Sequence, residues 1–263
     1  MRVGDLDLNV RSAGSGAPFL WAHGMLSSMQ AEDALDLLRW RAFPAALRLV
    51  RYDARGHGAS AAGAPPTWHD LGHDMLALAD AIGENRFIGG GWSMGCASAL
   101  HAALQQPDRV DGLVLVLPPT LWEARVAQAA LYRRAIALAH AAGPARFARM
   151  VASQGAGLPP WLLHAAPQLA AAGVRYPEPS AMLALYQGAA WSDLPPRAAL
   201  AALSATPALI VGWAGDAAHP LASAHELHRL LPMSSLFIAH DYQDVLSIPA
   251  RLRRFVEAVA ALR

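Results

Sequence analysis

Short apolar runs alternate with helical patterns in the first half of the chain, and this alternation constrains the fold more than any other feature. The apolar runs lie at residues 19–22, 47–52, 87–89 and 113–117, and the helical patterns at residues 31–40, 69–82 and 94–104. Residues 113–117 read Leu-Val-Leu-Val-Leu, which is typical of a strand covered on both faces. Strands that alternate with helices predict a parallel sheet joined by right-handed crossovers.

This alternation stops after Pro118 and Pro119. Residues 120–196 show helical stretches with Pro and Gly breaks but no convincing strand, and this segment is longer than an ordinary loop. The strand and helix patterns then return at residues 208–211, 221–231, 235–239 and 249–262, with Pro249 well placed to start a helix. We therefore expect an α/β core of residues 1–119 and 197–263, with a helical insertion of residues 120–196.

Composition excludes several classes of protein. The chain has 263 residues, 54% hydrophobic and 16% charged, with a net charge of +1, so it is too apolar for a disordered chain and offers no clustered basic face for nucleic acid. One cysteine excludes a disulfide scaffold and a multi-thiolate zinc site. No run of about 18 apolar residues predicts a membrane span, and residues 1–10 do not resemble a signal peptide. We expect a cytoplasmic protein with no membrane or nucleic-acid partner, and the sequence does not indicate its oligomeric state.

The strongest motif is Gly91-Trp92-Ser93-Met94-Gly95, which matches G-x-S-x-G between a predicted strand and a predicted helix. A chain that turns sharply from strand to helix exposes the serine hydroxyl, and the two glycines leave room for that turn. The start of the helix also offers free N–H groups to a developing negative charge. This context predicts that Ser93 is a nucleophile.

The motif, together with residues 21–25, 52–60 and 107–116, resembles the α/β-hydrolase fold family, of the serine esterase and lactonase type, over nearly the whole chain. The resemblance implies a doubly wound, mostly parallel sheet with helices on both faces and a helical cap formed by the insertion. It also implies an oxyanion hole made by the backbone N–H groups of Met25 and Met94. Cys96 stands where the family often has a small glycine, and we expect it to be a buried packing residue.

A serine nucleophile needs a base, and the base needs an acid that orients it. In this family the order along the chain is Ser, then Asp or Glu, then His. Asp216, in a Gly-Asp-x-x-His-Pro pattern, matches the acid, and His240, at the end of the predicted strand 235–239, is our predicted base. His219 is the main competitor, but it lies only three residues from Asp216 on the same loop. His23 is expected to order the oxyanion loop.

The resemblance implies acyl transfer on a small-molecule substrate, a carboxylic ester or lactone that is largely apolar. The insertion would then shape the acyl pocket, with Trp92 beside the nucleophile, although packing in the core explains the tryptophans equally well. The predicted substrate-binding residues are Trp92, Trp122, Arg125, Trp161 and Trp191. Arg125, Arg133 and Arg134 are candidates to bind a substrate carboxylate, but a solvated helix face explains these arginines better.

No metal or organic cofactor is expected. His69 and His73 have the i, i+4 spacing of a metal pair, but a solvated helix face explains them better. Two alternatives to an ester hydrolase stay open. A C–C bond hydrolase or a cofactor-free perhydrolase would use the same triad, and a non-catalytic relative would serve as a binding module.

Overall fold

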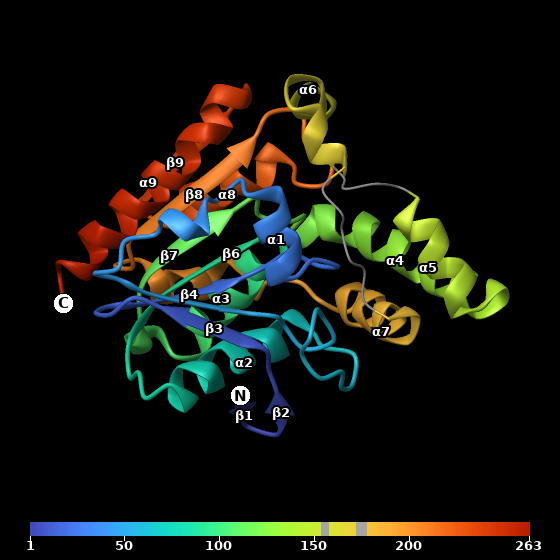
Figure 1. Cartoon of the computed structure of the whole chain (residues 1–263), viewed down its shortest axis with the longest axis horizontal. Helices are drawn as coiled ribbons and strands as arrows, with labels where there is room; N and C mark the ends of the chain where they lie inside the picture. The colour runs from blue at the N-terminus through green and yellow to red at the C-terminus, as the bar shows by residue number, and fades with distance from the viewer. Residues whose placement is uncertain (154–157, 172–177) are drawn as a thin grey trace.

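A seven-stranded sheet forms the centre of the computed structural model, which describes residues 1–153, 158–171 and 178–263 (Figure 1). The strand order is β3-β5-β4-β6-β7-β8-β9, in which β3 is antiparallel to β5 and all the other pairs are parallel. The strands are β3 (Val10–Ala13), β4 (Pro18–Ala22), β5 (Arg48–Tyr52), β6 (Phe87–Trp92), β7 (Val110–Val116), β8 (Ala208–Trp213) and β9 (Ser234–Ala239). A separate two-stranded hairpin joins β1 (Arg2–Val3) and β2 (Leu6–Asp7).

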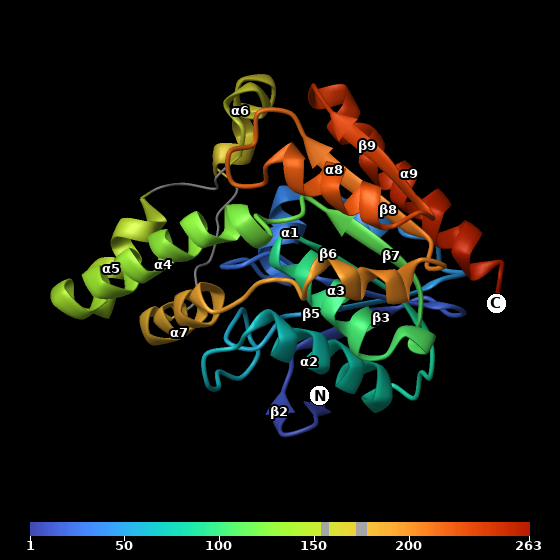
Figure 2. The ribbon, with the colours of Figure 1, turned by 180° about the vertical axis from the view of Figure 1, so that it is seen from behind.

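Helices cover both faces of this sheet, which confirms the predicted fold class. One face carries α2 (Trp68–Ala81), α3 (Met94–Gln105) and α8 (Leu221–Leu230), and the other carries α1 (Met29–Leu35) and α9 (Tyr242–Ala260) (Figures 1 and 2). Short 3-10 helices complete the core at η1 (Trp40–Ala42), η2 (Pro107–Arg109) and η4 (Arg197–Leu203).

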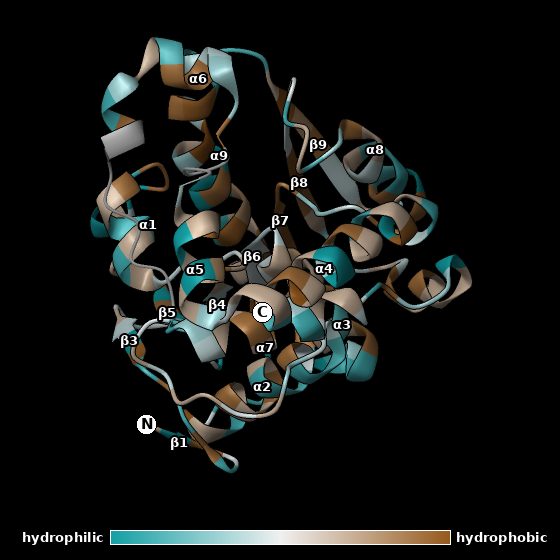
Figure 3. Ribbon diagram, turned by 90° about the vertical axis from the view of Figure 1, so that its right-hand side faces the viewer, coloured by the Kyte–Doolittle hydropathy of each residue, from teal (hydrophilic) through white to brown (hydrophobic). Residues whose placement is uncertain are grey.

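The side chains of β7 show why its sequence is continuously apolar. Leu113 and Leu115 pack in the core under α2 and α3, whereas Val114 and Val116 pack in the core under α9, and all four are fully buried. Successive residues of a strand point to opposite faces, so a strand between two helical layers must be apolar at every position. In Figure 3 the strand β8 is brown over much of its length, whereas the helices around the sheet alternate brown and teal.

The segment between β7 and β8, which we call the helical insertion (residues 120–196), contains no strand in the part that the structure describes. Its elements are α4 (Trp122–Ala142), α5 (Pro144–Ala152), α6 (Pro160–Ala165), η3 (Pro167–Ala171) and α7 (Pro179–Ala190). Helices α4, α5 and α7 pack on one another around a small apolar cluster that includes Phe147 and Met182. They project from the sheet as one group (Figures 1 and 2).

Two predicted helices have different bounds in the structure. The expected helix at residues 31–40 is split, because Asp36 and Arg39 adopt left-handed backbone angles, with φ of 48° and 49°. The last helix starts at Tyr242 and not at Pro249, because the Asp241 side chain accepts a hydrogen bond from the Asp244 N–H at 2.9 Å and caps the helix there. Pro249 is therefore buried inside α9.

Among the described helices, none has the length and apolarity that a membrane span requires.

Candidate active site

Ser93 lies at the sharp turn between β6 and α3, as the G-x-S-x-G motif predicts. Its φ of 55° and ψ of −111° are strained for a residue with a side chain. The Ser93 N–H donates to the Val116 carbonyl at 2.9 Å, which fixes the turn against β7. A Cβ atom at Gly91 would overlap the backbone of Gly95, and one at Gly95 would overlap the Ala22 carbonyl, so both positions require glycine.

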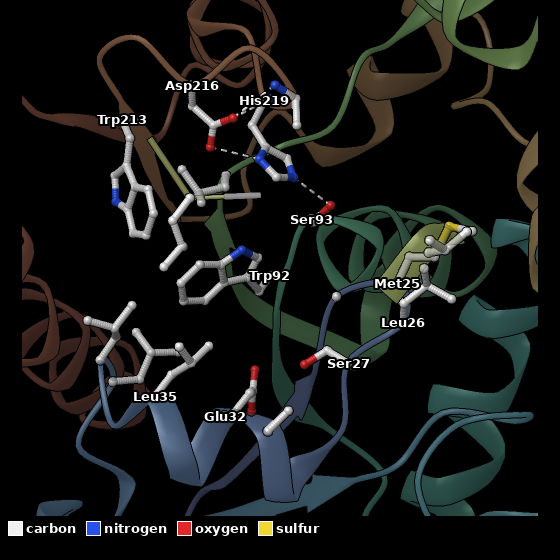
Figure 4. Close-up of a pocket in the computed structure, with 18 of the residues that line it drawn as sticks. Met25, Leu26, Ser27, Glu32, Leu35, Trp92, Ser93, Trp213, Asp216 and His219 are labelled. Carbon is white, nitrogen blue, oxygen red and sulfur yellow. Dashed lines mark hydrogen bonds and ion pairs between the residues drawn. The ribbon is translucent and has the colours of Figure 1, made fainter. Parts of the chain in front are cut away.

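Asp216 and His219 lie on the loop that follows β8, and both are brought to Ser93 (Figure 4). The Asp216 carboxylate accepts hydrogen bonds from the N–H groups of Ala218 at 2.9 Å and His219 at 3.1 Å. Its other oxygen is 2.9 Å from His219 Nδ1. On the far side of the ring, His219 Nε2 is 2.8 Å from Ser93 Oγ. With the Nδ1 proton donated to Asp216, Nε2 is free to accept the serine hydroxyl proton, which is the arrangement of a Ser-His-Asp triad.

His240 lies at the end of a strand, as predicted, but its ring is not placed at Ser93, as the predicted role of base would require. His240 follows β9 and is exposed, and no hydrogen bond within the described residues joins its ring to Ser93 or Asp216. Its backbone N–H donates to Asp244 at 2.9 Å, because the chain turns directly into α9 at this point. His219 takes the place expected for His240, because the backbone turn at Asp216 folds the loop back on itself. A spacing of three residues is therefore compatible with a direct ring–carboxylate contact.

Of the two residues predicted to supply the oxyanion hole, Met94 directly follows Ser93 in the chain and Met25 lines the same cavity as Ser93. Met94 is the first residue of α3, where backbone N–H groups have no partner inside the helix. Met25 lies on the loop after β4 and lines the cavity in front of Ser93. No hydrogen bond among the described residues uses either N–H group.

Two buried histidines hold the loop after β4, which carries Met25. His23 Nδ1 donates to the Gly24 carbonyl at 2.7 Å, and its Nε2 accepts from the Ala54 N–H at 3.0 Å. His57 Nε2 accepts from the Leu26 N–H at 3.1 Å, and its Nδ1 donates to the Arg55 carbonyl at 3.0 Å. Burial, followed by the neighbouring His23, lowers the pKa of His57 to about 3. His57 is therefore neutral at pH 7, and its free nitrogen lone pair fixes Leu26.

A largely apolar cavity of about 370 Å³ opens in front of Ser93. Its walls come from the loop after β4, from α1 and the residues that follow it, from β8 and from the helical insertion. The insertion contributes Tyr132, Val151, Leu158 and Tyr186. Trp92 and Trp213 lie side by side in the wall, with ring centroids 5.3 Å apart. Glu32 is a charged exception within this wall (Figure 4).

Of the five predicted substrate-binding residues, Trp92 lines the cavity and the other four do not. Trp122 donates to the Pro195 carbonyl at 2.9 Å, and Trp161 donates to the Ala214 carbonyl at 2.6 Å, so both serve in packing. Trp191 is 69% exposed at the end of α7.

Arg125 is buried away from the cavity and is not available to a substrate carboxylate. Its guanidinium donates to the carbonyls of Ser192 at 2.8 Å and Ala189 at 2.6 Å, and it lies 4.1 Å from the centre of the Trp68 ring. Burial lowers its pKa from the usual arginine value. The predicted role in substrate recognition is therefore corrected to a structural one.

Sequence reasoning missed most of the cavity wall. Some cavity residues lie on α5 and α7, and no sequence pattern specified how these two helices pack against the core. One signal was present for Glu32, since a carboxylate that interrupts the apolar face of a predicted helix requires an explanation.

Neither a second nucleophile nor a metal centre is found among the described residues. The Cys96 thiol is buried against the carbonyls of Gly91 and Val116, and this burial raises its pKa. Such a thiol stays protonated and is a packing residue, as predicted. No group of three His, Cys, Asp or Glu side chains in the described ranges could hold a metal ion, and His69 and His73 are both exposed.

Comparison with known proteins supports the fold. A family model described as the alpha/beta hydrolase fold matches residues 17–248. The 2-(acetamidomethylene)succinate hydrolase of Mesorhizobium japonicum is 30% identical over 117 residues, which cover 43% of this chain and 40% of that protein. The curated relatives that match are each aligned over less than half of their own length.

Solved structures match over almost the whole chain. A hydrolase from Pseudomonas aeruginosa PA01 superposes with a TM-score of 0.74 at 23% identity, covering 98% of this chain and 99% of that chain. The enol-lactonase from Burkholderia xenovorans LB400 superposes with a TM-score of 0.69 at 19% identity, covering 98% of this chain and 97% of that chain. At these identities the likeness establishes the fold.

Proposed function

Because the chain belongs to the α/β-hydrolase fold family, we propose that it is a serine hydrolase that cleaves a carboxylic ester or lactone of a small, largely apolar substrate. The observation that carries the proposal is the continuous hydrogen-bond chain from Asp216 through His219 to Ser93. The apolar cavity in front of Ser93 supports the substrate class. We further propose that the helical insertion acts as the cap of this cavity.

In the proposed reaction, Ser93 Oγ attacks the carbonyl carbon of the substrate while His219 Nε2 takes the hydroxyl proton. The N–H groups of Met25 and Met94 stabilise the negative charge that develops on the carbonyl oxygen. The bond from carbon to the leaving oxygen then breaks, and His219 returns the proton to that oxygen. Water, deprotonated by His219, then attacks the acyl carbon. The bond from this carbon to Ser93 Oγ breaks, His219 returns the proton to Ser93 Oγ, and the acid is released. Asp216 holds the imidazole in one tautomer and stabilises its charged form.

Replacement of the triad residues tests this proposal, with His240 as the matched control. We expect Ser93→Ala and His219→Ala each to lower kcat on a short p-nitrophenyl ester by at least about 10³-fold. His240→Ala should retain most of the activity, because its ring lies outside the triad. Circular dichroism and thermal melting would show that each variant is folded.

The opposite pattern, with His219→Ala active and His240→Ala inactive, would overturn the assignment of the base. A folded wild-type protein that cleaves no ester or lactone would exclude the proposed reaction. Activity only with hydrogen peroxide in place of water would then favour a perhydrolase. Activity only on a β-diketone would favour a C–C bond hydrolase. Lack of turnover in all of these assays would favour a binding module.

A further inference from the structure

The Glu32 carboxylate faces the substrate cavity although only 7% of its side chain is exposed. It lies in the first turn of α1, and Figure 4 shows it on the side of the cavity away from His219, pointing toward Trp92. A buried charge in an apolar pocket is costly unless it is compensated. The groups around Glu32 therefore indicate which chemical group of a substrate can bind beside this carboxylate.

Glu32 already has a compensating charge. Its carboxylate accepts a hydrogen bond from Trp21 Nε1, 2.9 Å and 3.2 Å from the two oxygens, and a second one from the Arg51 guanidinium at 3.1 Å. Arg51 also pairs with Asp33 at 2.5 Å, and Arg11 pairs with Asp33 at 2.7 Å. These two acids and two arginines sum to zero charge, so the pocket does not require a substrate cation to balance Glu32.

The carboxylate nevertheless has acceptor capacity left. An ionised carboxylate offers about four lone-pair positions, and the two donors from Trp21 and Arg51 do not fill them. The remaining capacity is on a side chain that lines the cavity, so a bound molecule can reach it.

Ser27 provides a second and independent observation. Its side chain also lines the cavity, and its hydroxyl makes no hydrogen bond with any residue in the described ranges. In Figure 4 the Ser27 hydroxyl points toward the side of the cavity on which Glu32 is drawn. One acceptor and one hydroxyl that line the same cavity can bind a group that both donates and accepts a hydrogen bond.

We propose that Glu32 and Ser27 form a polar subsite for an uncharged hydroxyl or amide group at the end of an apolar acyl or alkyl chain of the substrate. The substrate group donates to Glu32 and accepts from Ser27, while the apolar chain lies along Trp92. A substrate carboxylate is disfavoured, because its charge would be buried beside Glu32 and no arginine lines the described part of the cavity. This inference rests on the proposed ester or lactone hydrolase function, which it extends to a substrate class.

The test compares matched esters that end in a methyl, a hydroxyl or a carboxylate group. One series varies the acyl chain from four to eight carbons with p-nitrophenol as the leaving group, and the other varies the alcohol of acetate esters. In at least one series we expect wild-type kcat/KM to be about tenfold or more higher for the hydroxyl ester than for the methyl ester, and lowest for the carboxylate ester. A tenfold preference corresponds to about 1.4 kcal/mol.

Variants separate recognition from a purely structural role of Glu32. Glu32→Gln should reduce the hydroxyl-to-methyl ratio several-fold and raise the carboxylate-to-methyl ratio, whereas a structural role would change all three esters equally. Ser27→Ala should reduce the hydroxyl-to-methyl ratio by a smaller factor, and it decides the question if Glu32→Gln does not fold. Glu257→Gln, the same chemical change on an exposed face of α9, is the matched control and should keep the wild-type ratios.

Two results would overturn the inference while leaving the hydrolase function intact. One is a wild-type enzyme that shows no preference for the hydroxyl ester in either series. The other is a hydroxyl-to-methyl ratio that stays unchanged in both Glu32→Gln and Ser27→Ala. A folded wild-type protein that cleaves none of the esters would instead reject the proposed function, and the subsite proposal with it.

Discussion

His57 connects the ionisation of a single buried residue to the shape of the oxyanion loop. Its neutral Nε2 accepts the Leu26 N–H, so a proton on that nitrogen would remove the acceptor and place a donor against a donor. Burial and the nearby His23 oppose this protonation, which is why the pKa of His57 is lowered to about 3. The loop that carries the Met25 N–H therefore depends on a histidine that stays uncharged.

This lowered pKa predicts that the protein loses stability in mild acid. Between pH 6.5 and pH 3 the unfolded state binds a proton at His57 that the folded state does not, so the free energy of unfolding falls as the pH falls. We expect His57 to account for a loss of about 1–2 kcal/mol between pH 7 and pH 5. Urea unfolding at the two pH values measures the loss, which should be smaller in His57→Gln. His73→Gln, at an exposed position, is the control, and equal pH slopes for wild type and His57→Gln would contradict the prediction.

The places of Ser93 and Asp216, the proposed nucleophile and acid, could be predicted from the sequence, because their motifs specify local backbone geometry. Ser93 is defined by the two glycines that only a tight turn requires, and Asp216 by its loop after a strand. The base could not be chosen in this way, because both His219 and His240 follow strands that end at the same edge of the sheet. The choice depends on hydrogen bonds inside the Asp216 loop and on the early start of α9, which no residue pattern revealed.

Contacts between whole elements show the same limit of sequence reasoning. The order of strands and helices follows from periodicity, because each strand and helix must bury one or two faces. The packing of α7 against the core does not follow from it, since this contact joins residues more than a hundred positions apart. The Trp68 N–H, at the start of α2, donates to the Ser192 hydroxyl just after α7 at 2.9 Å.

Gly188 lies where α7 approaches the loop before α2 closely enough to exclude a side chain. A Cβ atom at Gly188 would overlap the Pro66 carbonyl, so α7 and the loop before α2 can approach only because this residue has no side chain. Alanine normally stabilises a helix relative to glycine, by up to about 1 kcal/mol. We expect the reverse here, with Gly188→Ala lowering the free energy of unfolding by about 1–3 kcal/mol through overpacking. Gly63→Ala, in an exposed loop with room for a methyl group, is the matched control for urea unfolding. A stabilised Gly188→Ala protein would show that the contact relaxes freely.

Across the whole molecule, Arg125 joins the helical insertion to the core. It lies on α4, donates to the two carbonyls at the end of α7 and covers the ring of Trp68, which belongs to α2. A buried cation held by carbonyls and an aromatic ring stabilises the packing of the elements that it joins. Its removal is costly, because the buried carbonyls are then left without hydrogen-bond donors.

We expect Arg125→Met to destabilise the helical insertion more than the central sheet. Hydrogen exchange should become faster in α4 and α7 by a factor that corresponds to about 2–4 kcal/mol, while exchange in β6, β7 and β8 changes less. Arg134→Met, on an exposed position of the same helix, serves as the control and should leave the exchange pattern unchanged. Uniform acceleration of exchange in the insertion and the sheet would contradict a role confined to this connection.

The short spacing of Asp216 and His219 has a consequence for the way the chain can be divided. Both groups precede α8, so the last strand and the last helix carry no member of the proposed triad. A chain cut in the turn between Pro232 and Met233 leaves Ser93, Asp216 and His219 on one fragment, and the other fragment supplies only β9 and α9 as a scaffold. Activity recovered when two such fragments are mixed would then measure only whether β9 and α9 complete the fold, because the larger fragment already carries all three residues of the proposed triad.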